Sequence, residues 1–315
     1  MPRPVGSDSL ASLSFRGINM VLGAVAALAA ALFWAIAAGW FSKMGRFMRP
    51  AEINFFKGVL AVVLFLATLL VTGGLQAGVT VATFWLLIIS GALGIGLGDT
   101  AYFESLSRLG VRLSLLLGIL APPMTAVMGL IFLGEELRPV AWLGILLTLA
   151  GVAWVITEQT TVGEHPRRLW AGIAYGVLFA LCQSGGAILS RLAFLQTTVT
   201  PMQSSVIRLV GGVVALGIGF ILFRQKIGGW MQIPERRSVW IWLLSATVIG
   251  TFLAIWLQQV SFKLTEVAVA QTLLGTSPLF GLVIGLISGE KITLRAVLGV
   301  LIATLGIAIL FGLIG

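Results

Sequence analysis

The fold is decided by residues 116–156, which read LLGILAPPMTAVMGLIFLGEELRPVAWLGILLTLAGVAWVI. An apolar stretch that contains two prolines runs into a short polar corner, and a second apolar stretch follows. Residues 273–310 read LLGTSPLFGLVIGLISGEKITLRAVLGVLIATLGIAIL and repeat this pattern at an offset of 155 residues. The pairs matched at that offset are Pro123 and Pro278, Gly134-Glu135 and Gly289-Glu290, Gly144 and Gly299, and Gly151 and Gly306. Matches of this kind in one register indicate an internal duplication.

The bulk composition indicates an all-α membrane protein. The chain has 315 residues, of which 58% are hydrophobic and 10% charged, and its mean hydropathy is +1.07. Soluble proteins contain about 25% charged residues. The net charge of +9 lies mostly in short connections between apolar runs, where it orients a membrane protein. We therefore expect the lipid bilayer, and no nucleic acid, as a partner.

Ten transmembrane helices are predicted, because apolar runs of about 20 residues are long enough to cross the hydrocarbon layer. Their expected bounds are 18–41, 52–72, 81–105, 112–133, 139–157, 169–190, 203–223, 238–261, 267–288 and 293–314. The polar segment 158–168 separates two sets of five, so the expected domains are 17–157 and 169–314. Because five is an odd number, the second set enters the membrane from the opposite side. The chain is thus predicted to form two inverted repeats, a plan common in secondary transporters.

The duplicated pattern resembles the EamA-type domain of the drug/metabolite transporter superfamily, present twice. The resemblance rests on residues 96–110 (GLGDTAYFESLSRLG) and on the repeated Pro, Gly-Glu and Gly positions, and it covers residues 17–314. It implies a ten-helix carrier with a central cavity, in a bacterial inner membrane or an equivalent organelle membrane.

The function implied by the resemblance is secondary transport of a small-molecule substrate by alternating access between the two repeats. An amino acid or related compound is the expected cargo, and export is the expected direction. A sugar, nucleotide-sugar or lipid-linked sugar is the alternative cargo. A proton or sodium ion is the candidate coupling partner. A membrane-embedded enzyme or an assembly subunit without transport represents the other functional classes.

Catalytic and cofactor-binding motifs are missing from the sequence. The single histidine, His165, falls in a polar connection and the single cysteine, Cys182, in an apolar run, which excludes a Cys/His metal site. Gly94, Gly96 and Gly98 follow no predicted strand and do not form a dinucleotide fingerprint. We expect no enzyme activity, no cofactor and no metal, with transport driven by an ion gradient or the cargo gradient.

Asp99 is the most informative acidic residue within a predicted span. An ionisable group at mid-bilayer costs about 2.5–3.5 kcal/mol on insertion scales and normally faces a cavity or a partner. We predict that Asp99 and nearby Tyr102 line the mouth of a cavity, where the carboxylate binds a cation or couples transport to protons. The alternative is that the helix ends here and Asp99 pairs with Arg108 or Arg112 at the membrane interface.

Lys57 and Arg208 are matched by the duplication, since each lies seven residues after a proline in the second or seventh span. We predict that they face the cavity and hold a carboxylate or phosphate of the cargo, or lock a gate with Glu52 or Asp99. The alternative is that both side chains extend to lipid headgroups.

The remaining predicted substrate-binding residues are the amides Asn54, Gln183 and Gln258 and the aromatic Trp34. The alternative for the amides is a bridge between helices, worth under about 1 kcal/mol each. Pro123 and Pro278 are predicted hinges, because proline removes a helix hydrogen bond and permits a flexible kink. Static curvature is the alternative for these two positions.

The positive charges also predict how the chain is oriented. With a cytoplasmic N-terminus, the inside connections would hold five Lys and Arg residues and the outside connections thirteen. The positive-inside rule therefore predicts that both termini lie outside, whereas the resemblance implies that both lie inside.

Overall fold

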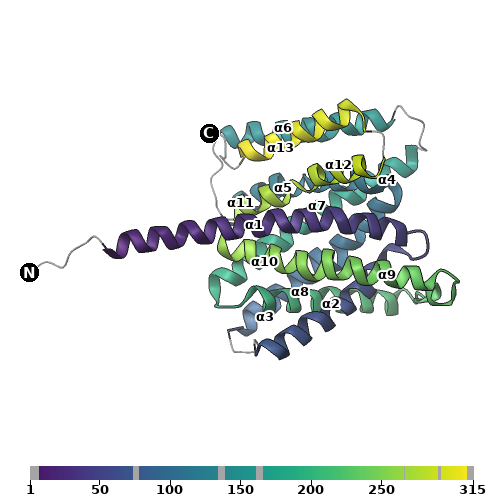
Figure 1. Ribbon diagram of the computed structural model, residues 1–315, viewed down its shortest axis with the longest axis horizontal. Helices are drawn as coiled ribbons and strands as arrows, with labels where there is room; N and C mark the ends of the chain where they lie inside the picture. The colour runs from purple at the N-terminus through teal and green to yellow at the C-terminus, as the bar shows by residue number, and fades with distance from the viewer. Residues whose placement is uncertain are drawn as a thin grey trace, which may run out of the picture.

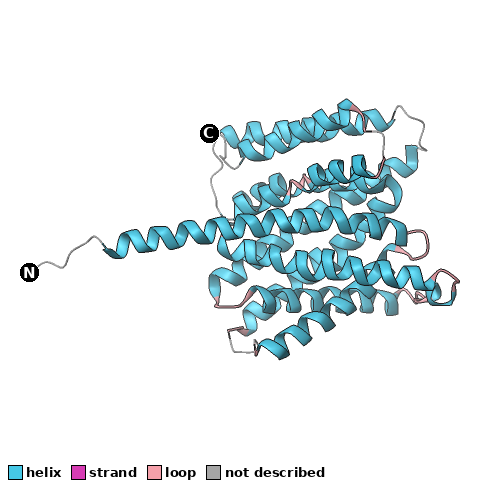
Figure 2. Ribbon diagram, viewed as in Figure 1, coloured by secondary structure: helices cyan, strands magenta, loops and turns pink. Residues whose placement is uncertain are grey.

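The computed structural model describes residues 7–73, 78–133, 139–160, 166–265, 267–289 and 292–310. Within these ranges the regular elements are helices (Figure 2). His165 and the corner residues Gly134, Glu135 and Glu290 lie outside the described residues.

The helices follow each other in a similar order in the two halves (Figure 1), and the second half has an additional short 3-10 helix. The first half consists of α1 (Ser7–Met44), α2 (Pro50–Thr72), α3 (Val81–Gly91), the π-helix η1 (Ala92–Asp99), α4 (Thr100–Gly118), α5 (Ala121–Leu133) and α6 (Pro139–Thr160). The second half consists of α7 (Pro166–Gln196), α8 (Pro201–Leu222), the 3-10 helix η2 (Gly229–Gln232), α9 (Arg236–Ala246), the π-helix η3 (Thr247–Leu253), α10 (Ala254–Leu264), α11 (Val267–Leu274), α12 (Ser277–Ile287) and α13 (Leu294–Leu310).

Six helical stretches of the described chain are long and apolar enough to cross a membrane. They are Asn19–Met44, Pro50–Thr72, Val81–Gly118, Arg167–Gln196, Pro201–Leu222 and Arg236–Leu264. Shorter apolar helices cover Ala121–Phe132, Trp142–Val155, Ser277–Ile287 and Leu294–Ile309. This arrangement is that of an integral, multi-pass membrane protein.

The 155-residue offset found in the sequence recurs in the helix boundaries. Adding 155 to the bounds of α3 gives the bounds of α9, and adding it to the first residue of η1 gives the first residue of η3. Both halves therefore interrupt the same span with a π-helix, an uncommon element that occurs often at functional sites. The duplication thus extends to a detail of backbone geometry that hydropathy does not predict.

The chain turns between the predicted third and fourth spans as expected, and the fourth and ninth spans are each divided further. Within the expected connection 106–111, Gly110 has φ 76° and ψ 178°, so α4 consists of two helical segments that meet at this residue. The hydroxyls of Ser105 and Ser114, on either side of Gly110, lie 3.2 Å apart, so the chain turns here. The chain also leaves helical structure at residues 119–120, between α4 and α5, and at residues 275–276, between α11 and α12. The fourth and ninth spans thus each consist of two helical segments rather than one bent helix.

The repeated prolines lie at the start of the second segment of each divided span. Pro123 and Pro278 lie in the first turns of α5 and α12, where backbone N–H groups have no acceptor within the helix in any case. Proline therefore removes no hydrogen bond at either position, and its fixed φ suits the start of the new segment. The flexible point available to each span is the break just before the proline.

The two halves exchange their first helices. α1 packs on α9, η3, α10, α11 and α12 of the second half, while α7 packs on α3, η1, α4 and α5 of the first half. α2 and α8 lie against each other and also contact the π-helix of the opposite half. The central layer of the bundle is therefore built from both copies of the duplicated unit.

α6 and α13, the last helices of the two halves, pack side by side at one edge of the bundle (Figure 1). A Cβ atom added to Gly151 would lie 2.7 Å from the carbonyl oxygen of Gly299, and one added to Gly306 would lie 2.7 Å from that of Gly144. Small residues permit such close approach of membrane helices. Because the C-terminal part of each helix meets the N-terminal part of the other, α6 and α13 are antiparallel.

Candidate functional site

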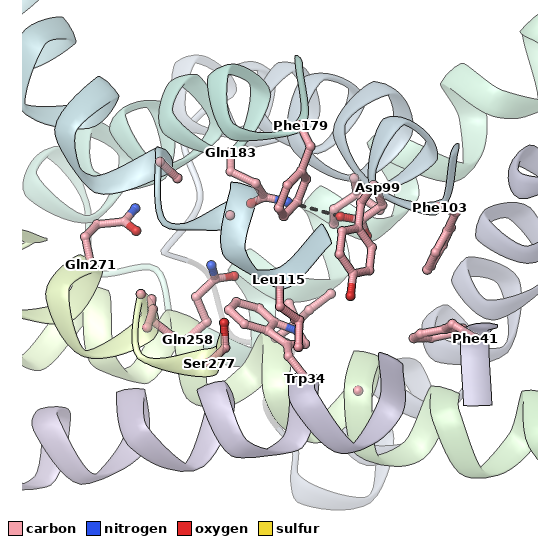
Figure 3. A pocket seen from close by; sticks show the side chains of 18 of the residues that line it. Trp34, Phe41, Asp99, Phe103, Leu115, Phe179, Gln183, Gln258, Gln271 and Ser277 are labelled. Carbon is pink, nitrogen blue, oxygen red and sulfur yellow. Dashed lines mark hydrogen bonds between the residues drawn. The ribbon is translucent and has the colours of Figure 1, made fainter. Parts of the chain in front are cut away.

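A cavity of about 110 Å³ lies between helices of both halves (Figure 3). Its lining residues in the first half are Trp34, Phe41, Lys57, Ile95, Asp99, Tyr102, Phe103, Leu115, Gly118, Ala121 and Pro122. Its lining residues in the second half are Phe179, Gln183, Arg208, Gly250, Ile255, Gln258, Gln271, Leu274, Gly275 and Ser277. Membrane transporters with internal repeats place their substrate sites at such a junction.

The π-helix η1 brings Asp99 to the cavity, and the side chain of Asn54 holds this segment in place. The Asn54 amide nitrogen donates to the carbonyl oxygens of Ile95 at 2.6 Å and Gly96 at 3.1 Å, and it lies 2.8 Å from the Thr100 hydroxyl. In lipid, carbonyls that are not bonded within their own helix need another partner. Asn54 is fully buried and is not among the lining residues, so it supports the site from behind.

Asp99 forms an ion pair with Lys57, and the two charges neutralise each other inside the bundle. Lys57 Nζ lies 2.5 Å from Asp99 Oδ2, and Gln183 Nε2 donates to Asp99 Oδ1 at 3.1 Å. Figure 3 shows Gln183 pointing toward Asp99. The Lys57 ammonium also lies 5.3 Å from the ring centroid of Phe103, which is a cation–π distance. This cluster joins α2, η1 and α7 across the two halves.

The structure places Lys57 and Asp99 at the cavity and Glu52 outside its lining. Asp99 pairs with Lys57, whereas Arg108 bonds to Glu104. Lys57 is 3% exposed and does not extend toward headgroups. Glu52 lies in the first turn of α2 and accepts hydrogen bonds from the backbone N–H groups of Arg49 and Gly228. It is not among the lining residues of the cavity.

Arg208 is the other cation of the cavity, and it is 2% exposed. Its position depends on glycine. A Cβ atom at Gly91 would lie 1.8 Å from the Arg208 carbonyl oxygen, and one at Gly94 would lie 3.2 Å from Arg208 Nη2. Arg208 Nε and Nη1 have no hydrogen-bond partner among the described residues. Asp99 acts electrostatically on Arg208, but a buried polar group without a hydrogen-bond partner is costly, so the cavity holds a cationic group with two nitrogen atoms open to a ligand.

Aromatic side chains form the apolar part of the cavity wall. The ring of Tyr102 lies 5.0 Å from that of Phe179 and 5.5 Å from that of Phe103. Trp34 of α1 faces the cavity near Leu115 (Figure 3). These rings suit the apolar body of a small organic molecule, as in most small-molecule sites.

The amides Gln258 and Gln271 and the hydroxyl of Ser277 add neutral polar groups on the second-half side of the cavity (Figure 3). Both helix breaks reach the same place, since Gly118, Ala121 and Pro122 border one break and Gly275 and Ser277 border the other. Discontinuous helices at a central site are a recurring feature of secondary transporters.

Seven of the eight predicted substrate-binding residues thus line one cavity, and Asn54 lies behind it. The predicted hinges Pro123 and Pro278 each lie one residue beyond a lining residue. Sequence reasoning missed Phe41, Phe103 and Phe179, which stand in apolar runs without any distinguishing pattern. It also missed Gly118 and Gly275, although both follow a Leu-Leu pair just before the repeated prolines.

Comparison with known proteins gives a family and a fold. The model of the EamA-like transporter family matches residues 21–157 and again residues 170–312. A solved structure, titled only "Crystal structure of protein", superposes with a TM-score of 0.67 over 91% of this chain and 95% of that chain, at 16% identity. No curated protein matches this sequence. Because these two matched regions together make up most of the chain, this protein belongs to the EamA-like transporter family.

Proposed function

We propose that the protein is a secondary transporter that moves a small metabolite across the membrane by alternating access between its two halves. The observation that carries the proposal is the central cavity, whose polar, charged and aromatic side chains come from both copies of the duplicated unit. A site at such a junction opens to one side or the other when the halves exchange conformations. The expected cargo is an amino acid or related compound, and the expected direction is export.

The geometry of the helices supports this mechanism in two ways. The antiparallel crossing of α6 and α13 is the relation expected if the two halves have opposite orientations in the membrane. The breaks at residues 119–120 and 275–276 give each half a point at which one segment can turn relative to the next. Pro123 and Pro278 lie in the first turns of α5 and α12, where proline prevents the preceding helix from continuing. We propose that each proline acts as a hinge by maintaining the break before it.

The test is substrate counterflow by the purified protein in liposomes, with candidates first selected from a metabolite library by thermal stabilisation. A bound cargo raises apparent stability by mass action. The cavity variant Trp34→Ala is expected to slow counterflow, whereas Trp85→Ala, at a side chain 56% exposed on the outside of the bundle, is expected to leave it unchanged. Equal effects of the two substitutions would remove the cavity as the transport site, and an absence of any counterflow would remove the proposed function.

A further inference from the structure

We infer that the transported molecule is an organic monoanion with one carboxylate, and that Arg208 is the residue that binds this carboxylate. The inference rests on the proposed transport function and names the substrate class of its cavity.

The first observation is the environment of the Arg208 guanidinium. Nε and Nη1 are buried and have no hydrogen-bond partner among the described residues, although the side chain lines the cavity. Other arginines do find partners. Arg191, on the adjoining helix α7, donates to the Phe262 carbonyl oxygen at 3.0 Å, and Arg168 donates to the Ser107 carbonyl oxygen at 2.9 Å. Arginine binds carboxylates strongly through charge-assisted hydrogen bonds, so an anionic ligand supplies what the protein leaves open at Arg208.

The second observation is an asymmetry between the two copies of the repeat. In the first half, Lys57 is neutralised by Asp99 at 2.5 Å. The position 155 residues after Asp99 is Ala254, which is fully buried and has no group that could pair with a cation. Asp99 also acts electrostatically on Arg208, but its direct contact is with Lys57, so Arg208 is the repeat-related cation that lacks a hydrogen-bonded carboxylate among the described residues. A carboxylate of the cargo would make with Arg208 the direct contact that Asp99 makes with Lys57.

The third observation is the charge count of the cavity. Its described lining contains two cations, Lys57 and Arg208, and one carboxylate, Asp99. A monoanion balances the single excess positive charge, whereas a dianion such as a phosphate ester reverses it. Both oxygens of Asp99 are engaged, one by Lys57 and the other by Gln183. The described lining therefore offers no free carboxylate that could bind the ammonium group of an amino acid. A 2-oxo, hydroxy or N-acyl acid suits the cavity better than a zwitterionic amino acid.

The experiment compares compounds that share the leucine side chain but differ in charge. They are the monoanions 4-methyl-2-oxopentanoate and N-acetyl-leucine, zwitterionic leucine, neutral N-acetyl-leucinamide and cationic leucinamide. Thermal stabilisation and counterflow are measured with the full chain in detergent and in liposomes. The monoanions are expected to bind at least about tenfold more tightly than the other three, which is the ratio that one charge-assisted hydrogen bond supplies.

Three variants separate binding from structure. Arg208→Gln is expected to weaken monoanion binding by about tenfold to a hundredfold, and to leave the melting temperature of the empty protein unchanged or higher, because a buried unpaired charge has been removed. Ala254→Asp retains the arginine but gives it an internal counterion, and the same loss of monoanion binding is expected. Arg191→Gln removes an arginine outside the cavity lining and is expected to keep the preference for monoanions.

The possible failures are distinguishable. Wild-type protein that transports leucine or leucinamide as well as it transports the acids overturns the substrate class but leaves the transporter function standing. Monoanion binding that survives in Arg208→Gln, or a melting temperature that falls in that variant while selectivity is retained, overturns the role of Arg208. The comparison of compounds on wild-type protein decides the substrate class even where a variant does not fold. A library without any transported compound overturns the proposed function itself.

Discussion

Lys57 and Arg208 occupy matched positions in the two halves, yet their electrostatic surroundings differ. Lys57 lies against a carboxylate and between two phenylalanine rings, Phe41 and Phe103, whereas the guanidinium of Arg208 retains unpaired nitrogen atoms. Burial of an ion pair is tolerated when geometry is good, but removal of one partner leaves an uncompensated charge. The duplication thus placed a cation at matched positions, and the difference between Asp99 and Ala254 leaves only Lys57 with a carboxylate in direct contact.

A prediction at the residue scale concerns the Lys57–Asp99 ion pair. Asp99→Asn is expected to destabilise the protein by about 3–5 kcal/mol, because the Lys57 ammonium is then buried without a counterion. The double variant Lys57→Met with Asp99→Asn removes both charges and is expected to recover most of that loss. Thermal unfolding of the purified variants measures both effects. A double variant no more stable than Asp99→Asn alone would show that the loss does not arise from the unpaired ammonium.

At the scale of elements, glycines fix how closely the helices approach. Gly91, at the end of α3, lies against the backbone of α8, so any added side chain must push two main chains apart. We expect Gly91→Ala to cost about 1–3 kcal/mol or more and to displace Arg208 from the cavity. Gly219→Ala, also on α8, meets nothing within 4 Å and is expected to leave the melting temperature unchanged or slightly higher. Equal melting temperatures for the two variants would contradict this packing.

The broken spans give a second prediction at this scale. In Pro278→Ala the chain can continue helically across residues 275–276, since the proline that blocks helix continuation is gone. The matching change across residues 119–120 replaces Pro122 together with Pro123, because Pro122 alone still interrupts the helix. We expect stability to change by less than about 1 kcal/mol because the prolines occupy first turns, while the rate of counterflow falls. Cargo affinity, measured in parallel, is expected to stay the same. An unchanged counterflow rate would mean that the breaks are static features.

Sequence reasoning succeeded where periodicity and composition carry the signal. The duplication follows from the repeated prolines and glycines, and the apolar spans follow from hydropathy. Most of the polar lining follows from residues that are unusual in a membrane helix, such as Asp99 and Arg208. The contact between Lys57 and Asp99 joins residues 42 positions apart, and the bond from Gln183 spans 84 positions. Such pairs depend on helix packing, so spacing along the chain could not predict them.

The role of Asn54 and the helix breaks were harder to predict. An amide inside an apolar span fits both a ligand site and a bridge between helices, and only the π-helix carbonyls opposite Asn54 decide for the second. Residues 119–120 have no helix-breaking side chain of their own, since they are Ile119 and Leu120. The break results from the prolines that follow, which start a new segment instead of bending the old one.

At the scale of the whole molecule, positive charges gather at one end of the bundle. Arg49, after α1, bonds to the Lys226 carbonyl oxygen in the connection after α8, and Arg168 of α7 bonds to the backbone at Ser107. The positive-inside rule predicts that this end is cytoplasmic and that both termini lie outside. A topology reporter fused after Gly315 is expected to be active on the external side. A cytoplasmic signal from the reporter would reverse the orientation but leave the cavity unaffected.

Alternating access by two opposed halves is the central claim, and side-specific labelling tests it most directly. Cys182 is the only cysteine of the chain, so Cys182→Ala gives a background in which Gln258→Cys introduces one thiol into the cavity lining. With cargo present, we predict that a membrane-impermeant thiol reagent modifies this residue in right-side-out and in inside-out vesicles. Modification from one side only, with transport intact, would contradict the account.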